Sequence, residues 1–149
     1  MRTKEIRYYL HNLDALREDI SNLTQSLETF KALDFDTKIT PTFSHLPKSQ
    51  DGNNSKVEQC IIKRDEQIYK VQREILKKKT ICDAIIGVLR YIDRDSVTWR
   101  VLELRYFDKK QGIRLTFRDI AQRLNYSVKT IEHIDGKIVS NIQKRLGFH

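Results

Sequence analysis

The residue types that most often carry out catalysis or bind metals are few and scattered in this chain. The two cysteines, Cys60 and Cys82, form no Cys-x-x-Cys pair, and the histidines have no ligand spacing: they are His11, His45, His133 and His149. On one helix the cysteines would lie about 33 Å apart, too far for a disulfide. Asp34 and Asp36 fall in a polar segment without other ligands, and there is no glycine-rich phosphate loop. We therefore expect no enzyme activity, no metal and no cofactor.

Positive charge is the chemistry that the sequence does offer. The 149 residues carry a formal net charge of +8, divided as −1 over residues 1–55, +4 over 56–94 and +5 over 95–149. Such an excess suits a polyanionic partner such as nucleic acid. The amino-terminal segment lacks the apolar core of a signal peptide, and no apolar run approaches the roughly 20 residues of a membrane span. We expect a cytoplasmic protein with no membrane contact.

The first third of the chain has a coiled-coil pattern. Residues 1–33 hold no glycine or proline, and their apolar residues step by three and four alternately: Ile6, Tyr9, Leu13, Leu16, Ile20, Leu23, Leu27 and Phe30. This spacing predicts one long amphipathic helix with a heptad seam, meaning the line of a and d positions. Residues 34–55 contain both prolines and the turn-forming run SQDGNNS, so they are predicted to be a linker.

A second long helix is predicted from Lys56 to about Asp93. Its seam holds Val57, Ile61, Ile68, Val71, Ile75, Cys82, Ile85, Leu89 and Ile92, with basic residues at two further positions, Arg64 and Lys78. Arg64 and Lys78 have two possible roles. Either they specify the register of the helix or its partner, or their side chains lie along a partly buried seam with the charged ends in water. The two helices predict an antiparallel hairpin, self-association into a dimer or higher oligomer, or both. Residues 1–94 would form this region and residues 95–149 a second domain.

Three shorter helices are expected in the second domain. The first covers about 96–107, and a loop follows at 108–112. Its apolar positions are Val97, Val101, Leu102, Leu104 and Tyr106, and Trp99 could join them. Thr116 and Asp119 resemble a capping box that begins the second helix, which runs to about Asn125. Ser127 is the expected N-cap of the third, which extends to about Leu146, where Gly147 allows a left-handed stop. The predicted fold is therefore all-α.

The second and third of these helices have the pattern of a helix-turn-helix. Ala121 is the small residue needed where two helices cross closely, and Asn125 is well suited to a turn with positive φ. The shared core is expected from Ile120, Leu124, Tyr126, Ile131 and Ile134. An alternative is a helical pair that serves only packing or partner binding.

The stretch RVLELRYF…LTFRDIAQRLNYSVKTIEHIDGKIVSNIQKRLG resembles sigma-70 region 4, the domain that reads the −35 promoter element. The likeness covers about Thr98 to Gly147. The layout of long helices, polar linker and sigma-like domain is similar to phage late-gene regulators of the RinA and ArpU type. This resemblance implies a double-stranded DNA partner, possible contact with RNA polymerase, and a location near the nucleoid of a bacterial host.

The resemblance also implies which residues meet DNA. The recognition helix would begin at Ser127, with Val128, Lys129, Glu132 and His133 facing the groove and Thr130 and Lys137 nearer the backbone. Lysine and histidine donate to guanine or phosphate, glutamate accepts from cytosine, and valine packs on a thymine methyl. Candidates for phosphate contacts are Arg118, Arg123, Lys144 and Arg145. Sigma factors tend to have arginine where Val128 and Glu132 stand, so the DNA sequence read would differ.

Each assignment has a simpler alternative. Glu132 could pair with a basic residue one turn away, and His133 could cap or pack. Lys144 and Arg145 would favour the helix dipole without DNA. The run Lys77–Lys79 would either meet flanking phosphates or be a solvated helix face.

The sequence thus predicts a DNA-binding transcription regulator, and specifically a phage or prophage late-gene activator that works as an oligomer. One alternative is a small terminase subunit that recognises DNA for packaging and assembles as a ring. Another is an interaction protein that binds RNA polymerase without DNA.

Overall fold

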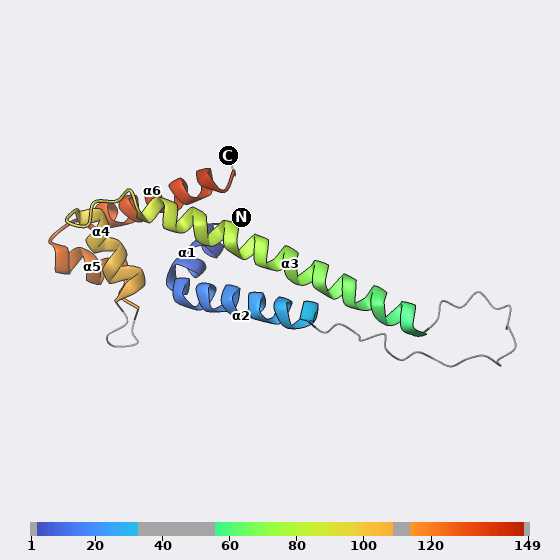
Figure 1. Ribbon diagram of the computed structural model, residues 1–149. Coiled ribbons are helices and arrows are strands. Elements are labelled where there is room, and N and C mark those ends of the chain that lie inside the picture. Colours follow the sequence, from blue (N-terminus) through green and yellow to red (C-terminus); the bar gives the residue numbers. More distant parts are fainter. Residues whose placement is uncertain (1–2, 33–55, 109–113, 148–149) are drawn as a thin grey trace, which may run out of the picture. The chain divides into compact units, whose positions relative to one another are not determined.

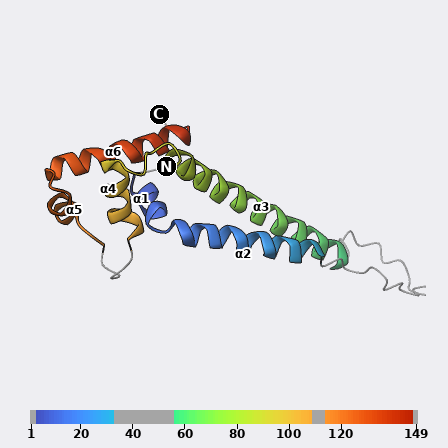
Figure 2. The ribbon, with the colours of Figure 1, turned by 60° about the vertical axis from the view of Figure 1, so that its left-hand side comes forward.

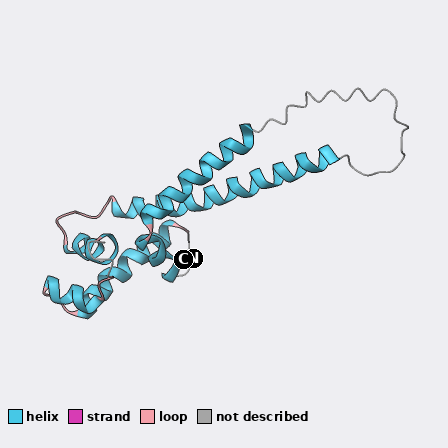
Figure 3. Ribbon diagram, turned by 90° about the horizontal axis from the view of Figure 1, so that it is seen from below, coloured by secondary structure: helices cyan, strands magenta, loops and turns pink. Residues whose placement is uncertain are grey.

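The computed structural model describes residues 3–32, 56–108 and 114–147, and every regular element among them is a helix (Figures 1 and 3). The predicted all-α class is confirmed for this part of the chain. The predicted linker 34–55 lies outside the described residues, as do residues 109–112 of the predicted loop.

The chain divides into two compact units that are described separately. Unit 1 contains Met1–Glu18 and Lys78–His149, and unit 2 contains Asp19–Lys77. This division differs from the predicted boundary between residues 94 and 95. The reason is that α1 (Thr3–His11) packs against α6 (Val128–Arg145), so the amino terminus joins the carboxyl-terminal part of the chain.

The predicted single helix over residues 1–33 is wrong in one respect, because it is interrupted at Asn12. Helix α1 ends at His11, and α2 (Leu13–Ala32) follows at an angle to it (Figure 2). The carbonyl oxygen of Tyr8 accepts both from the side-chain amide of Asn12 at 2.8 Å and from its backbone amide at 3.1 Å. In α1 the fully buried residues are Ile6 and Leu10, whereas the predicted seam residue Tyr9 is only half-buried.

The second long helix is α3 (Lys56–Leu89), which ends before the predicted Asp93. Its seam is buried only toward the carboxyl end, at Ile75, Cys82 and Ile85, while Ile61 is 39% exposed. Within unit 1, α3 also buries residues outside the predicted seam: Ile81, Ala84 and Val88. A heptad seam assumes one partner helix, but this end of α3 is covered over a wider face.

Within unit 2, α2 and α3 run alongside each other in opposite directions (Figures 1 and 2). Leu23, Leu27, Ile68 and Val71 are half-buried there. Of the two basic seam positions, Arg64 in unit 2 and Lys78 in unit 1 are both half-buried, and the Nε atom of Arg64 is buried.

The carboxyl-terminal part contains α4 (Val97–Leu102), a π-helical turn η1 (Glu103–Phe107), α5 (Phe117–Leu124) and α6. The predicted helix over 96–107 is therefore not α-helical throughout. The amide of Asp108 donates to the carbonyl of Glu103 at 2.7 Å, the five-residue step of a π-helix. Helix α6 contacts α1, α4 and α5, so it is the central helix of unit 1.

Candidate nucleic-acid interface

Helices α5 and α6 begin and end at the residues that the sequence indicated. Thr116 caps α5: its hydroxyl accepts from the Asp119 amide at 3.2 Å, and the Asp119 carboxylate accepts from the Thr116 amide at 2.8 Å. Asn125 ends α5 in the left-handed region, with φ of 61°. The Ser127 hydroxyl accepts from the Thr130 amide at 3.1 Å and so caps α6. These short-range bonds confirm the predicted capping residues.

The two helices cross through a small apolar core. Val101, Ile120, Ala121 and Ile131 are buried together, with half-buried apolar residues around them: Val97, Leu104, Leu115, Phe117, Leu124 and Ile134. Ala121 is 4% exposed, as expected for a small residue at a close crossing. The prediction that Tyr126 belongs to this core is wrong: it lies in the turn after the left-handed Asn125 and is 46% exposed.

The predicted groove-facing residues lie on the open side of α6. Val128, Lys129, Glu132, His133 and Lys137 are all exposed, and so is Ser127 before them. Thr130 is half-buried, and its hydroxyl lies 2.8 Å from that of Ser127. The opposite side of α6 is buried through Ile131, Asp135, Ile138, Val139 and Ile142. The first turns of α6 thus offer a polar surface with donors and acceptors, while the other side anchors the helix.

The predicted phosphate-binding residues separate into two places. Arg118 and Arg123 are exposed on α5, close in sequence to the start of α6. Lys144 and Arg145 lie in the last turn of α6, about 24 Å along the helix from Lys129 at 1.5 Å per residue.

Arg145 has a partner within unit 1. Its guanidinium carbon is 5.4 Å from the centre of the Tyr91 ring, and the side chain lies across Gly87 of α3. This residue therefore already makes an intramolecular contact at the position where a phosphate contact was expected.

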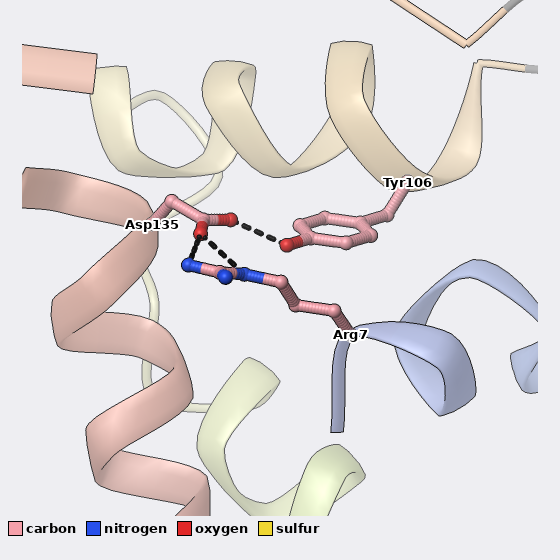
Figure 4. A network of polar contacts seen from close by, with 3 residues as sticks. All are labelled: Arg7, Tyr106 and Asp135. Atoms are coloured by element: carbon pink, nitrogen blue, oxygen red, sulfur yellow. Dashed lines mark hydrogen bonds and ion pairs between the residues drawn. The ribbon is translucent and has the colours of Figure 1, made fainter. Parts of the chain in front are cut away.

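A buried carboxylate on α6 was not anticipated from the sequence. Asp135 is 0% exposed, and its Oδ2 accepts from Arg7 Nη2 at 2.7 Å and from Arg7 Nε at 3.0 Å. The Tyr106 hydroxyl donates to Oδ1 (Figure 4). The available signal was the spacing of Ile131, Asp135 and Ile138, which places the aspartate on the apolar side of the helix.

The network perturbs the groups around it. Burial, together with the hydrogen bond to Asp135 and its charge, raises the pKa of Tyr106 well above its usual range. Burial lowers the pKa of Arg7, but the hydrogen bond and charge of Asp135 outweigh it and raise that pKa overall. The ring of His11 packs against that of Tyr106, with ring centres 4.5 Å apart and the ring planes tilted by 52°. Burial and the charges of Arg114 and Arg105 lower the pKa of His11 to about 4.

Among the described residues, no group of three or more histidines, cysteines or carboxylates is placed to hold a metal ion. Within the same ranges, none of the helices has the length and apolar character needed to cross a membrane. Comparison with known proteins found no matching family model, curated protein or solved structure.

Proposed function

We propose that this chain is a sequence-specific regulator of transcription that binds double-stranded DNA through α5 and α6. The two helices would act as a helix-turn-helix, with the amino-terminal turns of α6 in the major groove. The observation that carries the proposal is the division of α6 into two sides. One side is buried, whereas the other exposes Lys129 in the first turn and Glu132 and His133 in the second.

The chemistry of this surface suits DNA. Lys129 and His133 offer donors for guanine or phosphate, and Glu132 offers an acceptor for the amino group of cytosine. Arg118 and Arg123 add positive charge on α5, where they would contact phosphates and increase affinity without reading sequence.

The rest of the chain has a role in this proposal. Helices α2 and α3 would form a hairpin that joins two chains, so that two copies of α6 reach two half-sites on DNA. The resemblance of residues 98–147 to sigma-70 region 4 favours a role close to RNA polymerase, and we propose that the protein activates phage or prophage late genes there. Measurement of the mass in solution tests the pairing. A dimer or tetramer supports it, and a ring of eight or more subunits would favour the small terminase alternative.

The DNA contact is tested by charge reversal. Labelled fragments flanking the protein's own gene would be titrated with wild-type protein, Arg123→Glu and Lys129→Glu over a range of salt concentrations. Lys63→Glu makes the same change in charge at an exposed position of α3 in unit 2 that lies off the heptad seam, and it is the matched control. We expect each of the first two variants to lose at least tenfold in affinity, and Lys63→Glu less than twofold.

The salt dependence of the affinity distinguishes contacts with phosphates from contacts with bases. Loss of one phosphate contact reduces the slope of log affinity against log salt concentration by about 1. Arg123→Glu should show this reduction. Should both variants keep the affinity and the slope of the wild type, α5 and α6 do not bind DNA, and the alternative of a polymerase-binding interaction protein gains support.

A further inference from the structure

The buried Asp135 lies in the helix that would read DNA. It shares the buried side of α6 with Ile131, Ile138 and Ile142, each at most 3% exposed. An ionised carboxylate in such surroundings is strongly unfavourable unless its oxygens are paired. The partners of Asp135 therefore determine whether α6 can keep this side buried.

Both partners come from other elements of unit 1. Arg7 in α1 is 128 positions away in sequence, and Tyr106 in η1 is 29 positions away. Arg7 donates two N–H groups to one carboxylate oxygen and Tyr106 donates its hydroxyl to the other (Figure 4). Because these bonds are directional and approach from two elements, they restrict both rotation and sliding of α6.

The position of α6 matters for the surface on its other side. At about 100° per residue, His133 points roughly 160° away from Asp135, so any rotation that releases the carboxylate also moves the exposed side chains. Binding groups must be held to within about 0.5 Å and 10–20° of their productive geometry. The hydrogen bonds of Asp135 weaken when their distances or angles leave the preferred range, so they oppose such displacements of α6.

We propose that Arg7, together with Tyr106, is a positioning residue for the DNA-binding surface of α6. Helix α1 is then an essential part of the DNA-binding unit, although it stands at the opposite end of the sequence. This inference rests on the proposed function. Arg7 acts through Asp135, because two of its nitrogens are already bound to that carboxylate.

The test compares DNA affinity and its salt dependence for Arg7→Met and Arg7→Lys in the full chain. Methionine removes the charge and the donors, whereas lysine keeps the charge but loses the two parallel N–H groups. Arg17→Met, at an exposed arginine of α2 in unit 1, is the matched control. All measurements are made at least 20 °C below the melting temperature of each variant, so that only folded protein is compared.

We expect Arg7→Met to weaken binding at least tenfold, Arg7→Lys to weaken it less, and Arg17→Met to change it less than twofold. The salt slope of Arg7→Met should equal that of the wild type. Unchanged affinity in folded Arg7→Met would overturn the inference, since a residue needed only for stability would have this effect. A slope reduced by about 1 would also overturn it, because Arg7 would then contact a phosphate directly.

A second variant covers the case in which Arg7→Met does not fold. Arg7→Met/Tyr106→Phe/Asp135→Val removes the buried charge together with both of its partners, an exchange that proteins often tolerate and that leaves no buried hydroxyl without an acceptor. It lacks the directional bonds, so it should fold and still bind DNA at least tenfold more weakly. Wild-type affinity in this triple variant would refute positioning by Arg7 and Tyr106.

Failure of the proposed function can be distinguished from failure of this inference by hydrogen exchange. If the wild type binds no DNA, the proposed function fails. Backbone amides at 131–136 should still exchange faster in Arg7→Met or the triple variant than in Arg17→Met. Equal exchange rates there would refute positioning of α6 whatever the protein binds.

Discussion

The glycines of α3 and α6 allow one substitution to be compared in two surroundings. A Cβ atom added at Gly136 in α6 would have no heavy atom within 4 Å. Alanine in a helix interior is about 1 kcal/mol more favourable than glycine, so Gly136→Ala should stabilise the protein by up to that amount. For a chain of this size, the melting temperature would rise by roughly 2–4 °C.

Gly87→Ala in α3 should stabilise the protein much less than Gly136→Ala does. Its Cβ would lie 1.7 Å from Nη1 and 2.9 Å from Cζ of Arg145, so the guanidinium must move. The movement would break the contact between Arg145 and the Tyr91 ring, which at an exposed site contributes about 0.5–1 kcal/mol. The gain from helix propensity and the loss of this contact nearly cancel, and we expect little change in stability.

Thermal unfolding followed by circular dichroism measures both variants. The matched control repeats Gly87→Ala in an Arg145→Ala background, where the full gain of about 1 kcal/mol should return. A lower melting temperature for Gly136→Ala would show that atoms surround that position. Equal stabilisation by Gly87→Ala and Gly136→Ala in the wild-type background would refute the placement of Arg145 across α3.

Two further predictions concern the turn and the pH dependence of stability. Asn125 has φ of 61°, so Asn125→Ala should destabilise the protein by about 1 kcal/mol in urea unfolding, whereas Asn125→Gly should be nearly neutral. His11 has its pKa lowered from 6.5 to about 4, so the unfolded chain takes up a proton before the folded protein does. The melting temperature should therefore fall as the pH drops from about 6.5 towards 4, and His11→Gln should reduce this fall; an unchanged pH profile in the variant would contradict the argument.

Local signals in the sequence were sufficient for the ends of α5 and α6. The capping bonds of Thr116 and Ser127 join residues three positions apart, and the left-handed turns at Asn125 and Gly147 depend on those residues themselves. Such features require no knowledge of the rest of the fold. The exposed side of α6 followed from helical periodicity, since its apolar residues define the buried side.

Other features arise from contacts that periodicity does not reveal. The heptad pattern continues through Asn12, yet α1 turns away from α2 and packs on α6 and η1 instead of extending the seam. The spacing of residues 96–107 fits an α-helix, but the last part is a π-helical turn in which Tyr106 is buried. In both places tertiary packing overrides the local preference.

The sequence by itself determined that the chain is helical, where α5 and α6 begin and end, and which side of α6 is open. The reason is that capping, turn conformation and amphipathicity are set by residues within a few positions of one another. Only the tertiary structure decided that Arg7 and Tyr106 pair with Asp135 and that the amino terminus belongs to the same unit as α6. A buried charge needs a partner wherever the fold brings one, and a single sequence does not specify which distant residue that is.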